Sequence, residues 1–167
     1  MEWRARTVMT SPVISVPREA SVEEAARILT EAGISGAPVV DARGALVGVV
    51  SRFDLDAWLA GVHGRLARHG AYYAASALRW ARGDRDRDDE DEPDLEAAVD
   101  DVMTPELICV DGEAPLSDVV ELMSTRRIHR VLVTDGGKAT DPLLGVVTTL
   151  DVIDALAGRK RGDAGAI

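Results

Sequence analysis

The chain has 167 residues, enough for one compact domain of ordinary size or two small domains packed together. Its hydrophobic share of 46% is normal for a globular protein, and its single cysteine, Cys109, excludes an intrachain disulfide and fits a reducing compartment. No apolar run approaches the roughly 18 residues of a membrane-spanning helix, and no apolar run follows the arginines near the N-terminus. We therefore expect a soluble, cytoplasmic protein.

The formal net charge of −10 is concentrated in one segment. Residues 84–101 hold eleven acidic residues against two arginines, so the rest of the chain is nearly neutral. A run such as DRDRDDEDEPDLE has no apolar period and repels itself, which is more typical of a flexible, solvated linker than of a docking tail.

In chain order, the first part of the sequence predicts strand, helix, strand, strand and helix. The helix beginning at Ser21 has a capping-box pattern with Glu24, and apolar residues then recur at helical spacing. A tight turn through residues 42–44 joins two β-rich runs. The predicted elements are a strand at 12–16, a helix at 21–34, strands at 37–41 and 45–50, and a helix from residue 51.

Residues 60–82 predict an amphipathic helix with at least one interruption. Apolar residues there recur every three or four positions, while Gly61, Gly64 and Gly70 weaken helix continuity. The stripe is Leu55, Leu59, Val62, Leu66, His69, Tyr73, Ala77 and Trp80. It favours packing against a second copy of the chain. The adjacent arginines and aromatics would also suit nucleic acid, but the acidic run beside them repels phosphate.

The last part of the chain repeats the first. VMT at residues 8–10 recurs at 102–104, the helical stretch 21–34 matches 115–128, and GVVSRFDL matches GVVTTLDV. Finding the same patterns twice in the same order predicts two copies of one supersecondary unit. The expected domains are a first repeat at 1–60, an insert at 61–101 (amphipathic helix, then acidic flexible linker), a second repeat at 102–158 and a flexible tail at 159–167.

These two units resemble a tandem pair of CBS domains, also called a Bateman module. Each unit opens with VMT and closes with a Gly-apolar-apolar-Ser/Thr-x-x-Asp junction. The resemblance implies an α/β (α+β) fold in which two βαββα units pack pseudo-symmetrically through their sheets. It also implies clefts between the units that hold adenosine-containing ligands.

Two interpretations of the junction remain open on the residues alone. Ser51 with Asp54, and Thr148 with Asp151, can simply cap the helices that begin there. The same geometry offers free amides and a hydroxyl to a phosphate, and a carboxylate to a ribose. In the resembled family the Ser/Thr and Asp of this junction contact phosphate and ribose respectively. The paired repeats favour the binding interpretation for all four residues.

The two copies differ before their second strand. The second copy has His129 and Arg130 where the first has Ser35 and Gly36. A guanidinium suits a phosphate, and nucleotide-sensing members of the family carry a similar run whose side chains point at phosphates. We therefore expect the second copy to hold phosphate through Thr148, His129 and Arg130. The alternative is an exposed strand entry whose charges pair with acids.

A purine would also need an apolar slot, which the resemblance places beside the opening strand of each copy. In the second copy Leu132 stands where the first has Pro38, which changes that wall of the slot. All of these apolar positions also suit an ordinary core. The expected residues around the base are Val13, Ile14, Ser35, Gly36, Ala37, Pro38, Leu107, Ile108, Ile128 and Val131.

The sequence contains no motif typical of an enzyme or of a metal centre, such as G-x-S-x-G, H-E-x-x-H or a P-loop. We expect a stand-alone regulatory module, without cofactor, metal, nucleic acid or membrane partner. It would bind AMP, ADP or ATP, form a homodimer and signal to a separate, unidentified protein. Two alternatives stay open: a structural dimerisation module without ligand, and a sensor of S-adenosylmethionine or a divalent ion. Phosphate-dependent binding distinguishes the first hypothesis from both.

Overall fold

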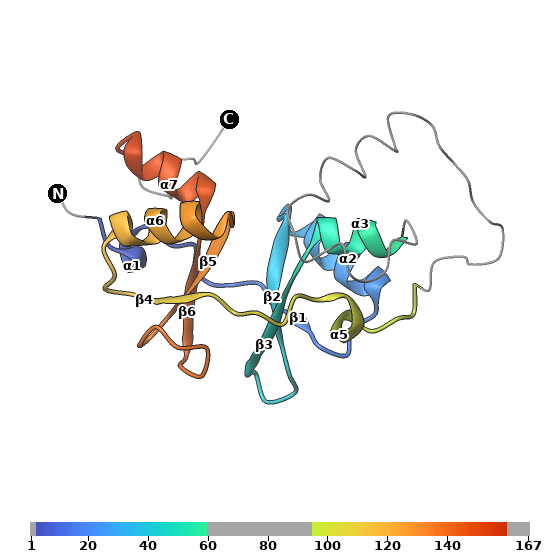
Figure 1. Ribbon diagram of the computed structural model, residues 1–167. Coiled ribbons are helices and arrows are strands. Elements are labelled where there is room, and N and C mark those ends of the chain that lie inside the picture. Colours follow the sequence, from blue (N-terminus) through green and yellow to red (C-terminus); the bar gives the residue numbers. More distant parts are fainter. Residues whose placement is uncertain (1–2, 60–94, 160–167) are drawn as a thin grey trace.

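The computed structural model describes residues 3–59 and 95–159, which form two repeats with the same order of elements (Figure 1). The first contains α1 (Ala5–Val8), β1 (Val16–Pro17), α2 (Val22–Glu31), β2 (Gly36–Val40), β3 (Leu46–Ser51) and α3 (Arg52–Leu59). The second contains α5 (Val99–Val102), β4 (Cys109–Asp111), α6 (Leu116–Arg126), β5 (Arg130–Thr134), β6 (Leu143–Thr148) and α7 (Thr149–Leu156). The predicted α+β fold of two matching units is confirmed.

Several expectations lie outside the described residues. They are the amphipathic segment 60–82, the acidic run up to residue 94 and the tail after residue 159. Among the residues that the structure describes, no helix has the length and apolar content needed to cross a membrane.

Each repeat forms a three-stranded sheet, and the two sheets have the same register. In both, the first strand runs parallel to the second, and the second runs antiparallel to the third. Val16 pairs with Val39, and Cys109 pairs with Leu132, at the same separation in sequence. Figure 1 shows the two sheets beside one another in the middle of the molecule, with the longer helices outside them.

The first strand is shorter than the predicted run 12–16, and Pro38 accounts for the difference. In the second repeat the N–H of Leu132 donates to the carbonyl of Ile108 at 3.0 Å. Pro38 occupies the matching position in β2 and has no N–H to donate to Ile14. Regular pairing in the first repeat therefore begins only at Val16.

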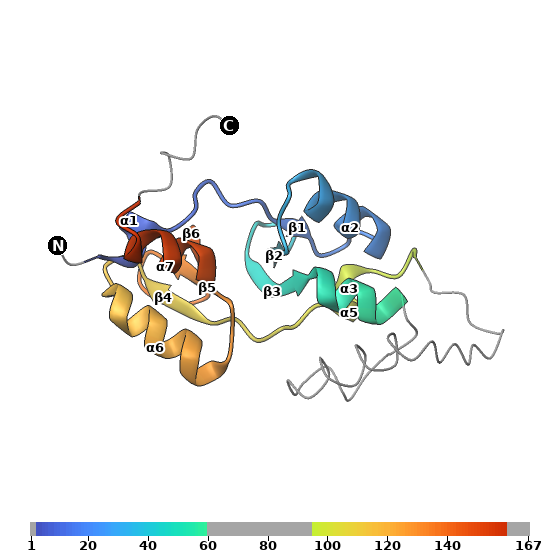
Figure 2. The ribbon, with the colours of Figure 1, turned by 90° about the horizontal axis from the view of Figure 1, so that it is seen from above.

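The opening segment of the first repeat packs against the second repeat. Within residues 3–10, the N–H of Ala5 donates to the carbonyl of Ala114 at 2.9 Å, and the N–H of Thr10 donates to the carbonyl of Val146 at 2.8 Å. Ala5 is fully buried in the core of the second repeat. Figure 2 shows α1 beside α7, as this packing requires.

The opening segment of the second repeat makes the matching contacts with the first. The N–H of Val99 donates to the carbonyl of Ala20 at 2.8 Å, and the N–H of Thr104 donates to the carbonyl of Val49 at 2.9 Å. Val99 is fully buried in the core of the first repeat, and α5 lies beside α3 (Figure 2). The repeats are thus related by a pseudo-two-fold axis and exchange their opening segments.

Residues 95–101 differ from the expectation that they belong to a flexible acidic linker. The N–H of Val22 at the start of α2 donates to the carbonyl of Ala97 at 2.9 Å, and the side chain of Val99 is buried. Apolar side chains at 97 and 99 therefore hold this stretch to the first repeat. Acidic residues dominated the sequence pattern, and two of them in this stretch, Glu96 and Asp101, are exposed.

Val99→Ala tests this packing. The substitution removes two buried methyl groups, so we expect the free energy of unfolding to fall by about 1 to 3 kcal/mol. Val120→Ala on α6 is the matched control, because that side chain is exposed and should change stability by less than about 0.5 kcal/mol. Urea unfolding followed by circular dichroism measures both. Equal effects would contradict a core position for Val99.

Candidate functional site

The two junctions have the same local geometry. The N–H and hydroxyl of Ser51 donate to Oδ2 of Asp54 at 2.7 and 2.6 Å, and the N–H of Asp54 donates back to the hydroxyl at 3.3 Å. The N–H and hydroxyl of Thr148 donate to Oδ2 of Asp151 at 2.7 and 2.6 Å, with a return distance of 3.4 Å. Each pair therefore caps the helix that follows it, α3 or α7.

The second oxygen of the carboxylate distinguishes the junctions. Asp151 is only 4% exposed, and its Oδ1 accepts a hydrogen bond from the hydroxyl of Thr10 at 3.2 Å. Asp54 is half-buried, and no donor within residues 3–59 and 95–159 bonds its Oδ1. Asp54 can therefore accept a further hydrogen bond, whereas both oxygens of Asp151 are already in use.

Arg130 connects the two repeats. Its backbone pairs with Thr148 in the second sheet, but its Nη2 donates to the hydroxyl of Ser35 in the first repeat at 3.0 Å. A methyl group at Gly36 would overlap the guanidinium and would lie 2.7 Å from the carbonyl oxygen of Val50. Glycine is therefore required where the arginine crosses.

This crossing places the positive charge on the side of the first repeat. Gly36 pairs with Ser51 in the register of β2 and β3, so the Arg130 guanidinium lies at the strand end that leads into α3. The same register makes Gly36 the counterpart of Arg130 itself. From the sequence we expected Arg130 to hold a phosphate in the second copy, whereas its guanidinium lies over Gly36 of the first.

The loop residues before β2 and β5 are fixed by matching backbone bonds. The carbonyl of His129 accepts from the N–H of Thr149 at 3.1 Å, and the carbonyl of Ser35 accepts from the N–H of Arg52 at 3.0 Å. His129 and Ser35 are both exposed. Arg52 also donates from Nε to the carbonyl of Ile34 at 3.1 Å, so its charge lies at the end of α2.

The residues expected around a purine are split between core and surface. Ala37, Pro38 and Val131 are buried, whereas Ile14 is 46% exposed. Ser35 is also exposed, while Val13, Gly36, Leu107, Ile108 and Ile128 are half-buried. Ile108 and Ile128 pack against the core of the second repeat, so within this set of residues the exposed apolar side chain is Ile14 of the first repeat.

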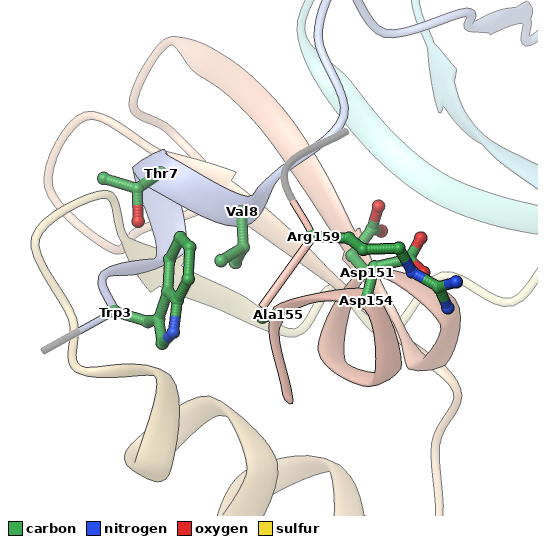
Figure 3. Close-up of a pocket in the computed structure, with 7 residues that line it drawn as sticks. All are labelled: Trp3, Thr7, Val8, Asp151, Asp154, Ala155 and Arg159. Atoms are coloured by element: carbon green, nitrogen blue, oxygen red, sulfur yellow. The ribbon is translucent and has the colours of Figure 1, made fainter. Parts of the chain in front are cut away.

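A pocket lies between α1 and α7 (Figure 3). It is lined by Trp3, Thr7, Val8, Asp151, Asp154, Ala155 and Arg159. Arg159 pairs with Asp154 at 3.1 Å, and Asp151 is the one lining residue that the sequence had assigned to a ligand. The sequence did not indicate this pocket. Trp3 occupies the position that Ala97 has in the other repeat, so the large side chain is not part of the repeated pattern.

Metal binding and thiolate chemistry are not supported by the described residues. No group of three or more His, Cys, Asp and Glu side chains gathers there in a way that could hold a metal ion. Burial raises the pKa of the Cys109 thiol, which lies in β4, so the thiolate is disfavoured at neutral pH.

The fold defines the class of the protein: two α+β repeats that exchange their opening segments around a pseudo-two-fold axis. The sequence model of the CBS domain matches residues 5–61 and 99–158. The chain therefore belongs to the CBS domain family and contains a tandem pair of CBS domains.

Two similar proteins contain the matching region as part of a longer chain. The chloroplastic CBS domain-containing protein CBSX2 of Arabidopsis thaliana is 30% identical over 141 residues, which cover 84% of this chain and 57% of that protein. The inosine-5'-monophosphate dehydrogenase of Korarchaeum cryptofilum is 30% identical over 150 residues, 89% of this chain but 23% of the enzyme. The chain thus spans about a quarter of the dehydrogenase.

Solved structures show the same fold. CBSX2 in complex with AMP superposes with a TM-score of 0.64 at 25% identity, covering 93% of this chain and 97% of that chain. The CBS domain pair of protein MJ0100, in complex with 5'-methylthioadenosine and S-adenosyl-L-methionine, gives a TM-score of 0.65 at 22% identity, covering 95% and 98%.

Gly36→Ala tests the crossing of Arg130. The added methyl group meets both the guanidinium and the Val50 carbonyl, so we expect the free energy of unfolding to fall by about 1 to 3 kcal/mol. Adding Arg130→Ala should restore part of this loss, because only the backbone contact then remains. A double-mutant cycle of thermal or urea unfolding measures the coupling. Strictly additive effects would show that the side chain does not lie over Gly36.

Proposed function

We propose that this CBS pair binds an adenosine-containing nucleotide, AMP, ADP or ATP, between its repeats and signals to a separate protein. The chain would act by binding and not by catalysis. The observation that carries the proposal is the first junction. There the start of α3 and an available oxygen of Asp54 lie at the strand end that the guanidinium of Arg130 reaches from the other repeat.

Each part of this junction suits a part of a nucleotide. The start of α3 presents backbone amides and a partial positive charge, which favour a phosphate. The guanidinium of Arg130 can bind phosphate oxygens through two parallel hydrogen bonds. The Oδ1 atom of Asp54 can accept from a ribose hydroxyl. Thr148, Asp151 and His129 form the corresponding candidate set in the second repeat.

The first repeat also favours an adenine base. Because Pro38 has no N–H, the carbonyl of Ile14 lacks the donor that the carbonyl of Ile108 has in the second repeat. That carbonyl can accept from the exocyclic amine of adenine, and the exposed side chain of Ile14 offers an apolar surface to the ring. Hypoxanthine has a carbonyl in place of that amine, so inosine monophosphate should bind more weakly than AMP.

The solved relatives support the ligand class. CBSX2 holds AMP, and the MJ0100 pair holds two molecules that contain adenosine without a phosphate. The first matches our proposal, and the second keeps S-adenosylmethionine as an alternative ligand. A charged phosphate contributes to binding only if the ligand is a nucleotide such as AMP, and not if it is S-adenosylmethionine.

Thermal stability measures binding without knowledge of the regulated protein. A ligand at a hundredfold its dissociation constant stabilises the native state by about 2.7 kcal/mol, which should raise the melting temperature by roughly 5 to 10 °C for a chain of this length. We expect AMP, ADP or ATP to produce this shift and adenosine or inosine monophosphate to produce less. The panel includes S-adenosylmethionine and 5'-methylthioadenosine.

The control is the double variant Asp54→Ala/Asp151→Ala, which removes both candidate ribose acceptors. Its melting temperature without ligand should fall, since each substitution removes a helix cap worth about 0.5 to 2 kcal/mol. Its shift with nucleotide should vanish. If no compound moves the wild-type melting curve, a module without ligand becomes the better hypothesis. If only S-adenosylmethionine moves it, the nucleotide proposal is wrong.

We further propose that the chain forms a homodimer. The sequence-based argument used the stripe between residues 59 and 80, which lies outside the described side chains. A second apolar surface supports the proposal within the described part. On α7, Leu150, Ile153 and Leu156 are 59%, 50% and 81% exposed at a spacing of three residues. Exposed apolar side chains in a contiguous group are typical of an interaction surface.

Leu156→Asp should weaken this association. The side chain is exposed, so the charge should leave the folded monomer intact while opposing burial of α7 against a second copy. Sedimentation velocity at micromolar concentration should show a dimer for the wild type and a larger monomer fraction for the variant. A wild-type monomer under these conditions would contradict the proposal.

A further inference from the structure

We propose that the chain holds a single nucleotide, at the first junction, and that Thr10 keeps the second junction closed. The inference rests on the proposed function, because it states which of two matching sites is used. It concerns a difference between Thr10 and Thr104, two residues that the repeated VMT motif makes identical in sequence.

The second junction is closed by a side chain that is firmly held. Thr10 exchanges two backbone hydrogen bonds with Val146, at 2.8 and 3.1 Å, and its hydroxyl donates to Oδ1 of Asp151 at 3.2 Å. The other oxygen of Asp151 already accepts from the N–H and hydroxyl of Thr148. Because Asp151 is 4% exposed and Thr10 bonds its Oδ1, a ribose hydroxyl would have to displace Thr10 to bond that oxygen.

The first junction lacks this closure. Thr104 exchanges the matching backbone hydrogen bonds with Val49, both at 2.9 Å, so the two backbones are placed alike. Its side chain is nevertheless exposed, and its hydroxyl makes no hydrogen bond to Asp54 within the described part of the chain. The direction of one hydroxyl therefore separates an available carboxylate from a covered one.

The positive charge of Arg130 also favours the first junction over the second. The guanidinium of Arg130 lies over Gly36 in the first repeat, and the counterpart position supplies no cation to the second junction, because it is Gly36 itself. Arg52, the first residue of α3, does not add to this charge, because its guanidinium donates to the carbonyls of Leu29 and Ile34 at the end of α2. A nucleotide phosphate is thus favoured at the first junction by charge, and its ribose by the available oxygen of Asp54.

The test counts nucleotides. Isothermal titration calorimetry of the full chain with AMP, ADP and ATP should give one site per chain for the best ligand. Asp54→Ala and Asp151→Ala remove equivalent helix caps, so they form a matched pair. Asp54→Ala should lower the affinity at least about tenfold more than Asp151→Ala, since only the first removes a hydrogen bond between a charged acceptor and the ligand.

Thr10→Ala tests the closure itself. Removing the hydroxyl removes the hydrogen bond that Oδ1 of Asp151 accepts from Thr10, so a second and weaker binding event should appear. Thr104→Ala removes the same group at the matching position and should leave the count at one. If Thr10→Ala shows no second event, the role assigned to Thr10 is wrong.

The remaining outcomes separate this inference from the proposed function. Two sites per wild-type chain, or a greater loss of affinity in Asp151→Ala than in Asp54→Ala, would overturn the inference while nucleotide binding stands. If none of the three nucleotides binds the wild-type chain, the proposed function fails and the inference fails with it. Circular dichroism melting curves confirm that each variant is folded at the titration temperature.

Discussion

The exchange of opening segments is the packing interaction on which the other features depend. Ala5 and Val99 are each fully buried in the core of the repeat to which they do not belong. Their N–H groups pair with the carbonyls of Ala114 and Ala20. Neither core is complete without a segment from the other half, so the repeats are held in one relative position. That position brings Arg130 to Gly36, and Thr10 to the second junction.

The arrangement of strands and longer helices could be predicted from the sequence because it depends on local patterns that occur twice. Ser21 accepts from the N–H of Glu24, as its capping pattern indicated, and both Ser/Thr-x-x-Asp junctions cap helices. The helices α1 and α5 could not be predicted. Each spans four residues, which is too short for an apolar period, and each is stabilised by contacts with residues far away in sequence.

The candidate site shows the same division between local and distant information. The residue types suited to phosphate and ribose were visible in the sequence, including Arg130. The repeat on which its guanidinium lies was not, because that depends on the absence of a side chain at Gly36 in the other copy. Thr10 and Thr104 occupy the same position in the repeated VMT motif and make the same backbone hydrogen bonds. Of these two hydroxyls, only that of Thr10 bonds a junction carboxylate within the described residues, that of Asp151, and the sequence does not indicate this difference.

The exchanged segments also affect the order in which the chain can fold. The hydroxyl of Thr10 bonds a carboxylate 141 positions further along the chain, and α1 packs on the last helix described. During synthesis the first repeat can close its core only after Val99 has been made, and residues 3–10 must wait for β6 and α7. Contacts between such distant residues slow folding, because the chain loses entropy before they form. We therefore expect the two repeats to complete their cores together and not one after the other.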